Sequence, residues 1–227
     1  MISPKEINNF HIKIVPCNEI PKIVDYLLKF YFTDEPLSKC LNLTKSPEAV
    51  KFLKEFCTEA LKENVSVLAT DKTGKIAGVS CNVILRKNIK HFNFNIDPKI
   101  EKIATFVLKT IDEAKVFEKY DDVNEALYIA FMSVHPGFRN QGLAKILLEQ
   151  SRLLALSLGL KVMRMDCCSL YTAKAAQRFG WECLNEIKYV DYTIDGKQVF
   201  KPEEPHKELG IYGIRIENTS FNLKSSI

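Results

Sequence analysis

The chain has 227 residues, of which 46% are hydrophobic and 26% are charged. This balance is typical of a globular protein and excludes a disordered, collagenous or low-complexity chain. The length predicts one domain that buries a full core without disulfides or metals. The net charge of +4 suits a protein that binds a phosphorylated small molecule. We expect no nucleic-acid partner, because such binding calls for a more basic, clustered surface.

Cysteine usage and the N-terminal residues indicate the compartment. The seven cysteines have no spacing typical of a metal site, and their odd number and apolar neighbours favour reduced thiols. Residues 1–10 lack the apolar core of a signal peptide, and no run approaches the roughly 18 apolar residues of a membrane span. We therefore expect a cytoplasmic protein with no metal and no membrane partner, and we expect a monomer.

Strand and helix patterns alternate along the chain. Apolar residues that recur every three or four positions predict helices, and short apolar runs predict strands. The expected helices cover residues 19–32, 47–62, 98–119, 141–158 and 170–179. The expected strands cover residues 10–15, 65–70, 75–85, 127–134, 161–166, 183–193 and 211–217. The pattern predicts one α/β (α+β) domain with a central mixed sheet flanked by helices.

Local signals support several of these boundaries. Ser46 before Pro47 favours a helix start, because serine caps the free N–H groups and proline suits the first helical position. Pro36 keeps Glu35 out of the helical region, so we expect a loop there. Asp195 and Gly196 predict a turn.

A glycine-containing loop, VHPGFRNQGLA at residues 134–144, joins an expected strand to an expected helix. Gly142 and Ala144 let the backbone approach a ligand closely, and the free N–H groups of a helix's first turn bind anions. Arg139 and Lys145 add positive charge. The loop is neither a P-loop nor a dinucleotide fingerprint. It predicts a phosphate site, the alternative being a strand–helix turn without a ligand.

This loop resembles motif A of the GNAT acetyltransferases, [RQ]-x-x-G-x-[GA]. The segment FTDEPL at residues 32–37 is similar to the FxDEPL segment of insect-type arylalkylamine N-acetyltransferases. MSVHP at residues 132–136 and DCCS at residues 166–169 also resemble that family. The order of elements agrees over roughly residues 10–217. The resemblance implies a single GNAT acyl-CoA N-acyltransferase domain over residues 1–227.

By this resemblance the protein binds acetyl-CoA. Backbone amides of motif A would hold the pyrophosphate, and the preceding strand, which splays from its neighbour in GNAT folds, would bind the pantetheine arm. The implied acetyl-CoA contacts are Met132, Ser133, Val134, Arg139, Asn140, Gln141, Gly142, Leu143, Ala144 and Lys145. Lys174 is a further candidate for the phosphates, although a charge on a short helix is usually part of its solvated face.

Acetyl transfer to an amine needs a base, because an alkylamine with a pKa of about 10.4 is protonated at neutral pH. By resemblance, Glu35 matches the general base proposed for the insect enzymes. Physically, a carboxylate beside Phe30, Tyr31 and Phe32 would be partly desolvated, as suits a base. Asp34 is the rival base, and the alternative is a solvated loop pair without a catalytic role.

The tetrahedral oxyanion needs a donor, and backbone N–H groups of Met132–Val134 are the candidates. Many GNAT enzymes place an acidic tyrosine four residues before a Gly-aromatic pair. Here that pair is Gly180–Trp181 and the position holds Ala176. A CoA thiolate, comparable to the cysteine reference of about 8.5, can leave without strong acid help.

Three polar residues follow the strand at residues 161–166. By resemblance, Cys168, Ser169 and Thr172 lie near the CoA sulfur or the acceptor amine. Cys168 and Thr172 replace serines of the insect enzymes, which puts a proton relay in doubt. Ser169 is equally well explained as a helix N-cap.

We expect the acceptor pocket to include Tyr31, Phe32, Asp34 and Tyr189. An aromatic slot suits an arylalkylamine such as dopamine, tyramine, octopamine or serotonin, although these side chains also suit a core. Polyamines and histamine are alternative acceptors. A peptide or protein acceptor would need an open groove, which the loop at residues 201–205 could border or cover. A non-catalytic acyl-CoA-binding module would not need Glu35.

Overall fold

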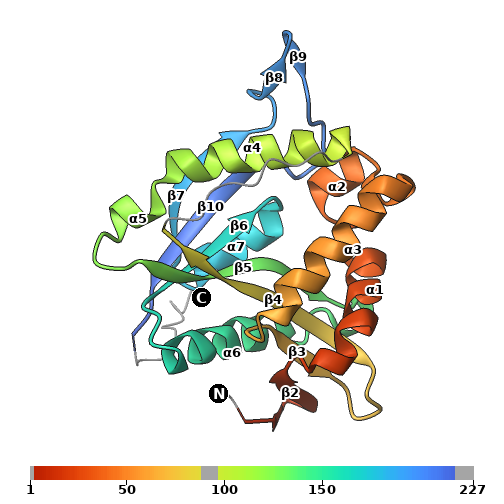
Figure 1. The fold of residues 1–227 in the computed structure, drawn as a ribbon, viewed down its shortest axis with the longest axis vertical. Coiled ribbons are helices and arrows are strands. Elements are labelled where there is room, and N and C mark those ends of the chain that lie inside the picture. Colours follow the sequence, from red (N-terminus) through yellow and green to blue (C-terminus); the bar gives the residue numbers. More distant parts are fainter. Residues whose placement is uncertain (1–2, 88–96, 218–227) are drawn as a thin grey trace.

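The computed structural model describes residues 3–87 and 97–217. Its main feature is an eight-stranded sheet in the order β1-β2-β3-β4-β5-β6-β10-β7, with helices on both faces (Figure 1). β5 and β6 pair in parallel, and the other described neighbours pair antiparallel. The expected mixed α/β fold is therefore confirmed.

The strands of the main sheet are β1 Lys5–Ile7, β2 Phe10–Ile14, β3 Val67–Thr70, β4 Ile76–Arg86, β5 Glu125–Val134, β6 Val162–Cys167, β7 Glu182–Lys188 and β10 Glu208–Arg215. The helices are α1 Ile20–Phe30, α2 Pro36–Cys40, α3 Pro47–Lys62, α4 Pro98–Ala114, α5 Val116–Lys119, α6 Leu143–Ser157 and α7 Leu170–Arg178. β8 Thr193–Ile194 and β9 Lys197–Gln198 form a separate hairpin that projects beside α4 (Figure 1).

Two apolar layers enclose the sheet. One contains α6 and α7, whose buried residues such as Leu147 and Ala176 pack with strand residues such as Leu127. The other contains α1 and α3, with Leu27 and Leu53 in its core. No helix among residues 3–87 and 97–217 is long and apolar enough to cross a membrane.

Three expected elements differ in extent. The helix expected over residues 98–119 breaks at Lys115, which takes a left-handed φ of 46° and separates α4 from α5. After the break, Val116 is buried in a cluster with Ala126, Val162 and Ile211 of β5, β6 and β10. The strand expected over residues 183–193 ends at Lys188, because the backbone turns there, with the Asp191 N–H donating to the Lys188 carbonyl. Pro36, expected in a loop, instead begins the short helix α2.

Other local predictions are confirmed. Ser46 caps α3 by accepting a hydrogen bond from the Ala49 N–H at 3.3 Å. Asp195 and Gly196 form the β8–β9 turn, both with positive φ.

A β-bulge positions the end of β5. Cys81 on β4 faces Phe131, whereas the next residue, Asn82, faces Ile129, so Ala130 is the extra residue of the bulge. The parallel ladder with β6 covers Leu127–Ile129. Beyond the bulge, β5 stays paired with β4, and no described residue continues the ladder to β6. The splay expected from the family resemblance is therefore present.

Candidate active site

The loop between β5 and α6 has the geometry of an anion site. Gly142 takes a left-handed φ of 73° and begins α6, and no described side chain caps that helix. A Cβ added at Gly142 would meet no atom within 4 Å. The first-turn N–H groups of α6 thus have no described side-chain cap, the space beside Gly142 is open, and Arg139 and Lys145, both near in sequence, are exposed. This arrangement fits the pyrophosphate of a CoA thioester.

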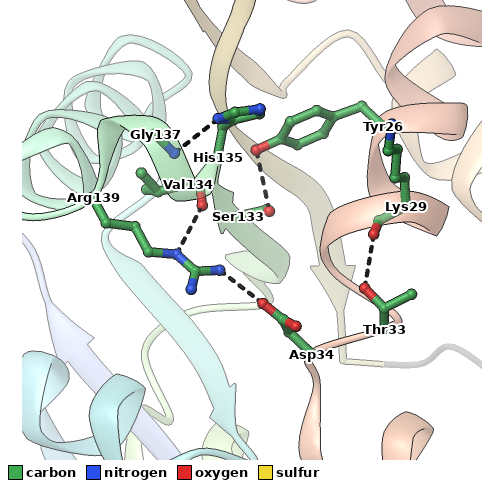
Figure 2. Close-up of polar contacts among 9 residues, drawn as sticks. All are labelled: Tyr26, Lys29, Thr33, Asp34, Ser133, Val134, His135, Gly137 and Arg139. Carbon is green, nitrogen blue, oxygen red and sulfur yellow. Dashed lines mark hydrogen bonds and ion pairs between the residues drawn. The ribbon is translucent and has the colours of Figure 1, made fainter.

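His135 shapes this loop. Its Nδ1 accepts a hydrogen bond from the Gly137 N–H at 3.0 Å (Figure 2), and its ring lies 4.7 Å from that of Phe30. Burial lowers the pKa of His135, and the cations Lys75 and Lys29 lower it further. The imidazole is thus neutral at physiological pH, as an acceptor at Nδ1 requires.

Asp34 and Arg139 join the two loops that flank the site (Figure 2). The Arg139 Nη2 atom donates to Asp34 Oδ2 at 2.8 Å, and its Nε atom donates to the Val134 carbonyl at 3.3 Å. Asp34 was expected to bind substrate and Arg139 to bind acetyl-CoA. Here both are about half exposed and paired with each other, and neither lines the cavity described below.

Glu35 caps α2 with its carboxylate. Oε1 accepts from the Leu37 N–H at 2.9 Å and Oε2 accepts from the Ser38 N–H at 2.7 Å. The side chain is half-buried. These two backbone donors fix the carboxylate on the wall of a cavity.

The cavity has a volume of about 670 Å³ and lies between α3, α4 and the strands β4, β5 and β6. Its volume is in the usual range for small-molecule sites. The expected acceptor residues Tyr31 and Phe32 line it. Other aromatic side chains on its wall are Phe52, Phe56, Phe117, Tyr128 and Phe131. The interior polar side chains on the wall are Glu35, Ser38, Arg164, Asp166 and Cys168.

Cys168 lies next to Glu35. Burial, together with the carboxylates of Glu35 and Asp166, raises the pKa of the Cys168 thiol well above its usual value, and the thiol hydrogen-bonds to Glu35. It is therefore a neutral donor rather than a thiolate. Its backbone carbonyl accepts from the Tyr189 hydroxyl at 2.6 Å.

Tyr189, expected in the acceptor pocket, does not line the cavity. It is buried in a core cluster with Phe106 and Phe200. The Tyr189 hydroxyl thus holds the backbone at Cys168 from the core and not from the cavity.

Other predicted site residues lie at two places, three at α7 and one, Ser133, in β5. Ser169 caps α7, accepting from the Tyr171 N–H at 3.2 Å, and Thr172 is half-buried on the same helix. Neither lines the cavity, and Lys174 is exposed. In β5, the Ser133 hydroxyl lies 3.3 Å from the Tyr26 hydroxyl (Figure 2).

Sequence reasoning missed His206. Its Nδ1 accepts from the Leu170 N–H at 3.3 Å. Burial lowers the pKa of His206, and the nearby Glu35 carboxylate opposes that shift. A histidine in a polar loop far along the chain carries no local signal, since only tertiary structure brings it near Glu35.

Sequence reasoning also missed the polar group of Tyr128, Arg164 and Asp166 on the cavity wall. Arg164 and Asp166 are the charged residues of the otherwise apolar strand VMRMDC at residues 162–167. That departure from an apolar strand is the signal that could have revealed them. No group of three or more His, Cys, Asp or Glu in the described ranges could hold a metal ion.

The splayed strand, the glycine at the start of α6 and the carboxylate-bearing cavity define an acyl-CoA-dependent transferase. A model of the acetyltransferase (GNAT) family matches residues 35–181. The chain belongs to this family and is an acetyl-transferring enzyme; enzymes of the family use acetyl-CoA.

The chain is also similar to several solved structures. The crystal structure of arylalkylamine N-acetyltransferase 2 from Aedes aegypti is 30% identical, with a TM-score of 0.86, and the match covers 92% of this chain and 100% of that chain. A mosquito arylalkylamine N-acetyltransferase like 5b is 19% identical, with a TM-score of 0.76 and coverage of 91% and 100%. A Drosophila melanogaster polyamine N-acetyltransferase is 23% identical, with a TM-score of 0.74 and coverage of 91% and 100%. The last two likenesses concern the fold alone.

Proposed function

We propose that this enzyme transfers the acetyl group of acetyl-CoA to the primary amine of an arylalkylamine, with Glu35 as general base. The observation that carries the proposal is the fixed Glu35 carboxylate on the wall of a cavity lined by aromatic side chains. An aromatic, largely apolar wall suits an aryl ring, and a carboxylate suits an ammonium group. The name of the 30% identical Aedes aegypti structure agrees with this acceptor class.

Acetyl-CoA would lie along the splayed end of β5. The amides at the start of α6 would take the pyrophosphate, with Arg139 and Lys145 adding charge. The backbone of Met132–Val134, which makes no described ladder to β6, offers groups for the pantetheine arm. Bound acetyl-CoA supplies an activated thioester carbonyl.

Glu35 would remove the proton of the acceptor ammonium, directly or through water. Each carboxylate oxygen accepts one backbone hydrogen bond and keeps a further lone pair for this proton. The amine then attacks the thioester carbonyl to form a C–N bond, and backbone N–H groups of β5 would stabilise the oxyanion. When the C–S bond breaks, the CoA thiolate leaves. The thiolate takes up the second proton, which the attacking nitrogen gives up as the amide forms, so no separate acid is required.

A peptide or protein acceptor is less well supported. The loop at residues 201–205 is tied to α2, since Lys39 pairs with Glu203 at 2.6 Å and the Lys201 N–H donates to the Cys40 Sγ at 3.1 Å. These contacts hold the loop against α2, the helix that Glu35 caps, rather than leaving it free to border an open groove. This arrangement favours a small acceptor.

An acceptor panel with Glu35→Gln tests the proposal. We expect wild type to release CoA thiol with phenethylamine and tyramine, and Glu35→Gln to lower kcat by about 100-fold or more with little change in acetyl-CoA affinity. Asp97 is a matched control, because it caps α4 by accepting from the Lys99 N–H at 2.7 Å and lies outside the cavity lining. Asp97→Asn should keep normal kcat. Undiminished activity in Glu35→Gln would contradict the assignment of Glu35 as the general base.

A further inference from the structure

A buried ion pair lies on the wall of the acceptor cavity. Arg164 donates from Nε and Nη2 to the two oxygens of Asp166, at 2.8 and 2.6 Å. The Tyr128 hydroxyl donates to Asp166 Oδ2 at 2.8 Å, and the Arg164 guanidinium lies 4.5 Å from the Tyr128 ring centre. The side chains of Arg164 and Asp166 are 3% and 6% exposed. The three residues form one connected network, which we name the polar subsite.

The fold does not need this ion pair. Desolvating two charges costs about as much as their attraction returns, and apolar pairs of similar size are often as stable or more stable. β6 already buries Met163, Met165 and Cys167 in the core on its other face. The charges lie instead on the face that lines the cavity. A role in binding is the simplest reason for their presence there.

The polar subsite lies away from the reacting amine. Arg164 and Asp166 are alternate residues of β6 and share one face, and Cys168, which follows the strand, lines the same cavity together with Glu35. The Glu35 carboxylate raises the pKa of the Cys168 thiol, so Cys168 marks the Glu35 end of this row. Asp166 lies two residues back, roughly 7 Å along the strand. This separation is comparable to the length of an arylethylamine, so the amine at Glu35 would direct its ring toward the polar subsite.

The polar subsite has no net charge. One carboxylate is balanced by one guanidinium, and Tyr128 stays a neutral phenol because burial and the Asp166 carboxylate raise its pKa. A second cation placed at the polar subsite would therefore meet a guanidinium rather than a free carboxylate. A ring hydroxyl, in contrast, can accept from arginine or donate to the carboxylate, because it is both donor and acceptor.

We propose that Tyr128, Arg164 and Asp166 recognise a hydroxyl group on the acceptor ring, so that the enzyme prefers phenolic monoamines to unsubstituted arylalkylamines and to diamines. This specificity role rests on the proposed function, because it takes the cavity as the acceptor site.

Kinetics with matched acceptors test the polar subsite. We expect kcat/KM for tyramine to exceed that for phenethylamine by about tenfold or more, and putrescine to be the poorest of the three, because a site built to bond a hydroxyl rejects the analogue without it. Arg164→Met/Asp166→Leu removes both charges together and leaves no unpaired ion. In this variant we expect the tyramine preference to fall to within about twofold.

Two further variants distinguish a loss of hydroxyl recognition from a general effect on folding. Arg152→Met/Glu149→Leu removes a second buried pair, in which Arg152 donates to both Glu149 oxygens on the far layer, and should keep the tyramine preference. Tyr128→Phe changes a single hydroxyl and should lower the preference at least about threefold even if the double variant fails to fold, as thermal unfolding would reveal.

The outcomes separate the two proposals. Equal kcat/KM for tyramine and phenethylamine in wild type, or a preference that survives in folded Arg164→Met/Asp166→Leu and in Tyr128→Phe, overturns the polar subsite and leaves the proposed function intact. Acetylation of putrescine without either arylalkylamine overturns both.

Discussion

Arg139 of the phosphate loop pairs with Asp34, the residue immediately before the proposed base, with 2.8 Å between Nη2 and Oδ2 (Figure 2). The pair connects the end of β5 to the start of α2. Because both side chains are about half exposed, the pair adds little to stability, on the order of 1 kcal/mol or less. The pair instead affects position, since it holds the backbone that carries Glu35 to the loop between β5 and α6, where we propose that acetyl-CoA binds.

Asp34→Asn should therefore lower kcat several-fold while the melting temperature changes by only about 1 °C. The expected cause is a less well-placed Glu35. Asp122→Asn is the control, because it breaks another exposed pair, with Arg215 at 2.6 Å, and should leave kcat unchanged. Steady-state kinetics with differential scanning fluorimetry check both. A kcat equal to wild type in Asp34→Asn would show that the pair does not position the base.

Substitutions at Gly142 separate backbone strain from steric exclusion of acetyl-CoA. Alanine there keeps a left-handed φ at a cost of about 1 kcal/mol, and its Cβ meets no atom within 4 Å. Tryptophan adds similar strain but fills the space before α6. We expect Gly142→Trp to weaken acetyl-CoA binding more than about 100-fold and Gly142→Ala to weaken it far less, measured by calorimetry. Gly159→Ala is the control for strain, because Gly159 also has a positive φ. It should lower stability without changing acetyl-CoA affinity. Unchanged affinity in Gly142→Trp would remove the phosphate-loop assignment.

Much of the fold was predictable because its signals are local. Periodicity located α3, and Ser46 and Pro47 fixed its start, since caps act within one turn. Lys115 shows the limit, because its left-handed conformation follows from tertiary packing of α5 rather than from a glycine or proline. The residues of β1 lie at an edge and carry too short a pattern to be recognised.

The site was predictable where one loop carries the chemistry. Gly142 and Arg139 stand in a single motif, and Glu35 was found by family resemblance rather than from spacing. Tyr128 was missed because its importance depends on which strands meet at the cavity, and His206 because only the folded chain brings its loop to the start of α7. Tyr189 shows the converse error, since an aromatic residue beside the site in sequence packs in the core instead.

Buried thiols predict a loss of stability at alkaline pH. Burial raises the pKa of Cys81 to about 12 and raises the pKa values of Cys57, Cys167 and Cys168 above their usual range. The native state therefore keeps protons that the unfolded state releases above about pH 8.5. Because the native state then binds more protons, stability is fully present below that pH and falls as pH rises, by up to about 1.4 kcal/mol per pH unit for each thiol.

Urea unfolding at pH 7.5 and 9.5 measures this slope. Cys57→Ala should reduce the slope of the free energy of unfolding against pH by the contribution of one thiol. It should also lower stability at both pH values, because packing is lost. Cys17→Ala is the control, because Cys17 is exposed and should leave the slope unchanged. A slope in Cys57→Ala identical to that of wild type would contradict the assignment.

Hydrogen bonds of Asn82 link the β-bulge of β4 and β5 to α6, the helix that follows the proposed acetyl-CoA loop. Its fully buried amide donates to the Val65 carbonyl at 2.9 Å and to the Ser151 hydroxyl of α6 at 3.0 Å, and its Oδ1 accepts from Ser80 at 2.7 Å. Asn82→Ala leaves these partners unsatisfied, so we expect about 2–4 kcal/mol less stability in urea unfolding. Because the same network fixes α6 to β4, the strand that pairs with β5, KM for acetyl-CoA should also rise. Ser157→Ala is the control, since its hydroxyl bonds only the Leu154 carbonyl of its own helix. A loss of stability with an unchanged KM would mean that the network supports the fold without positioning the donor.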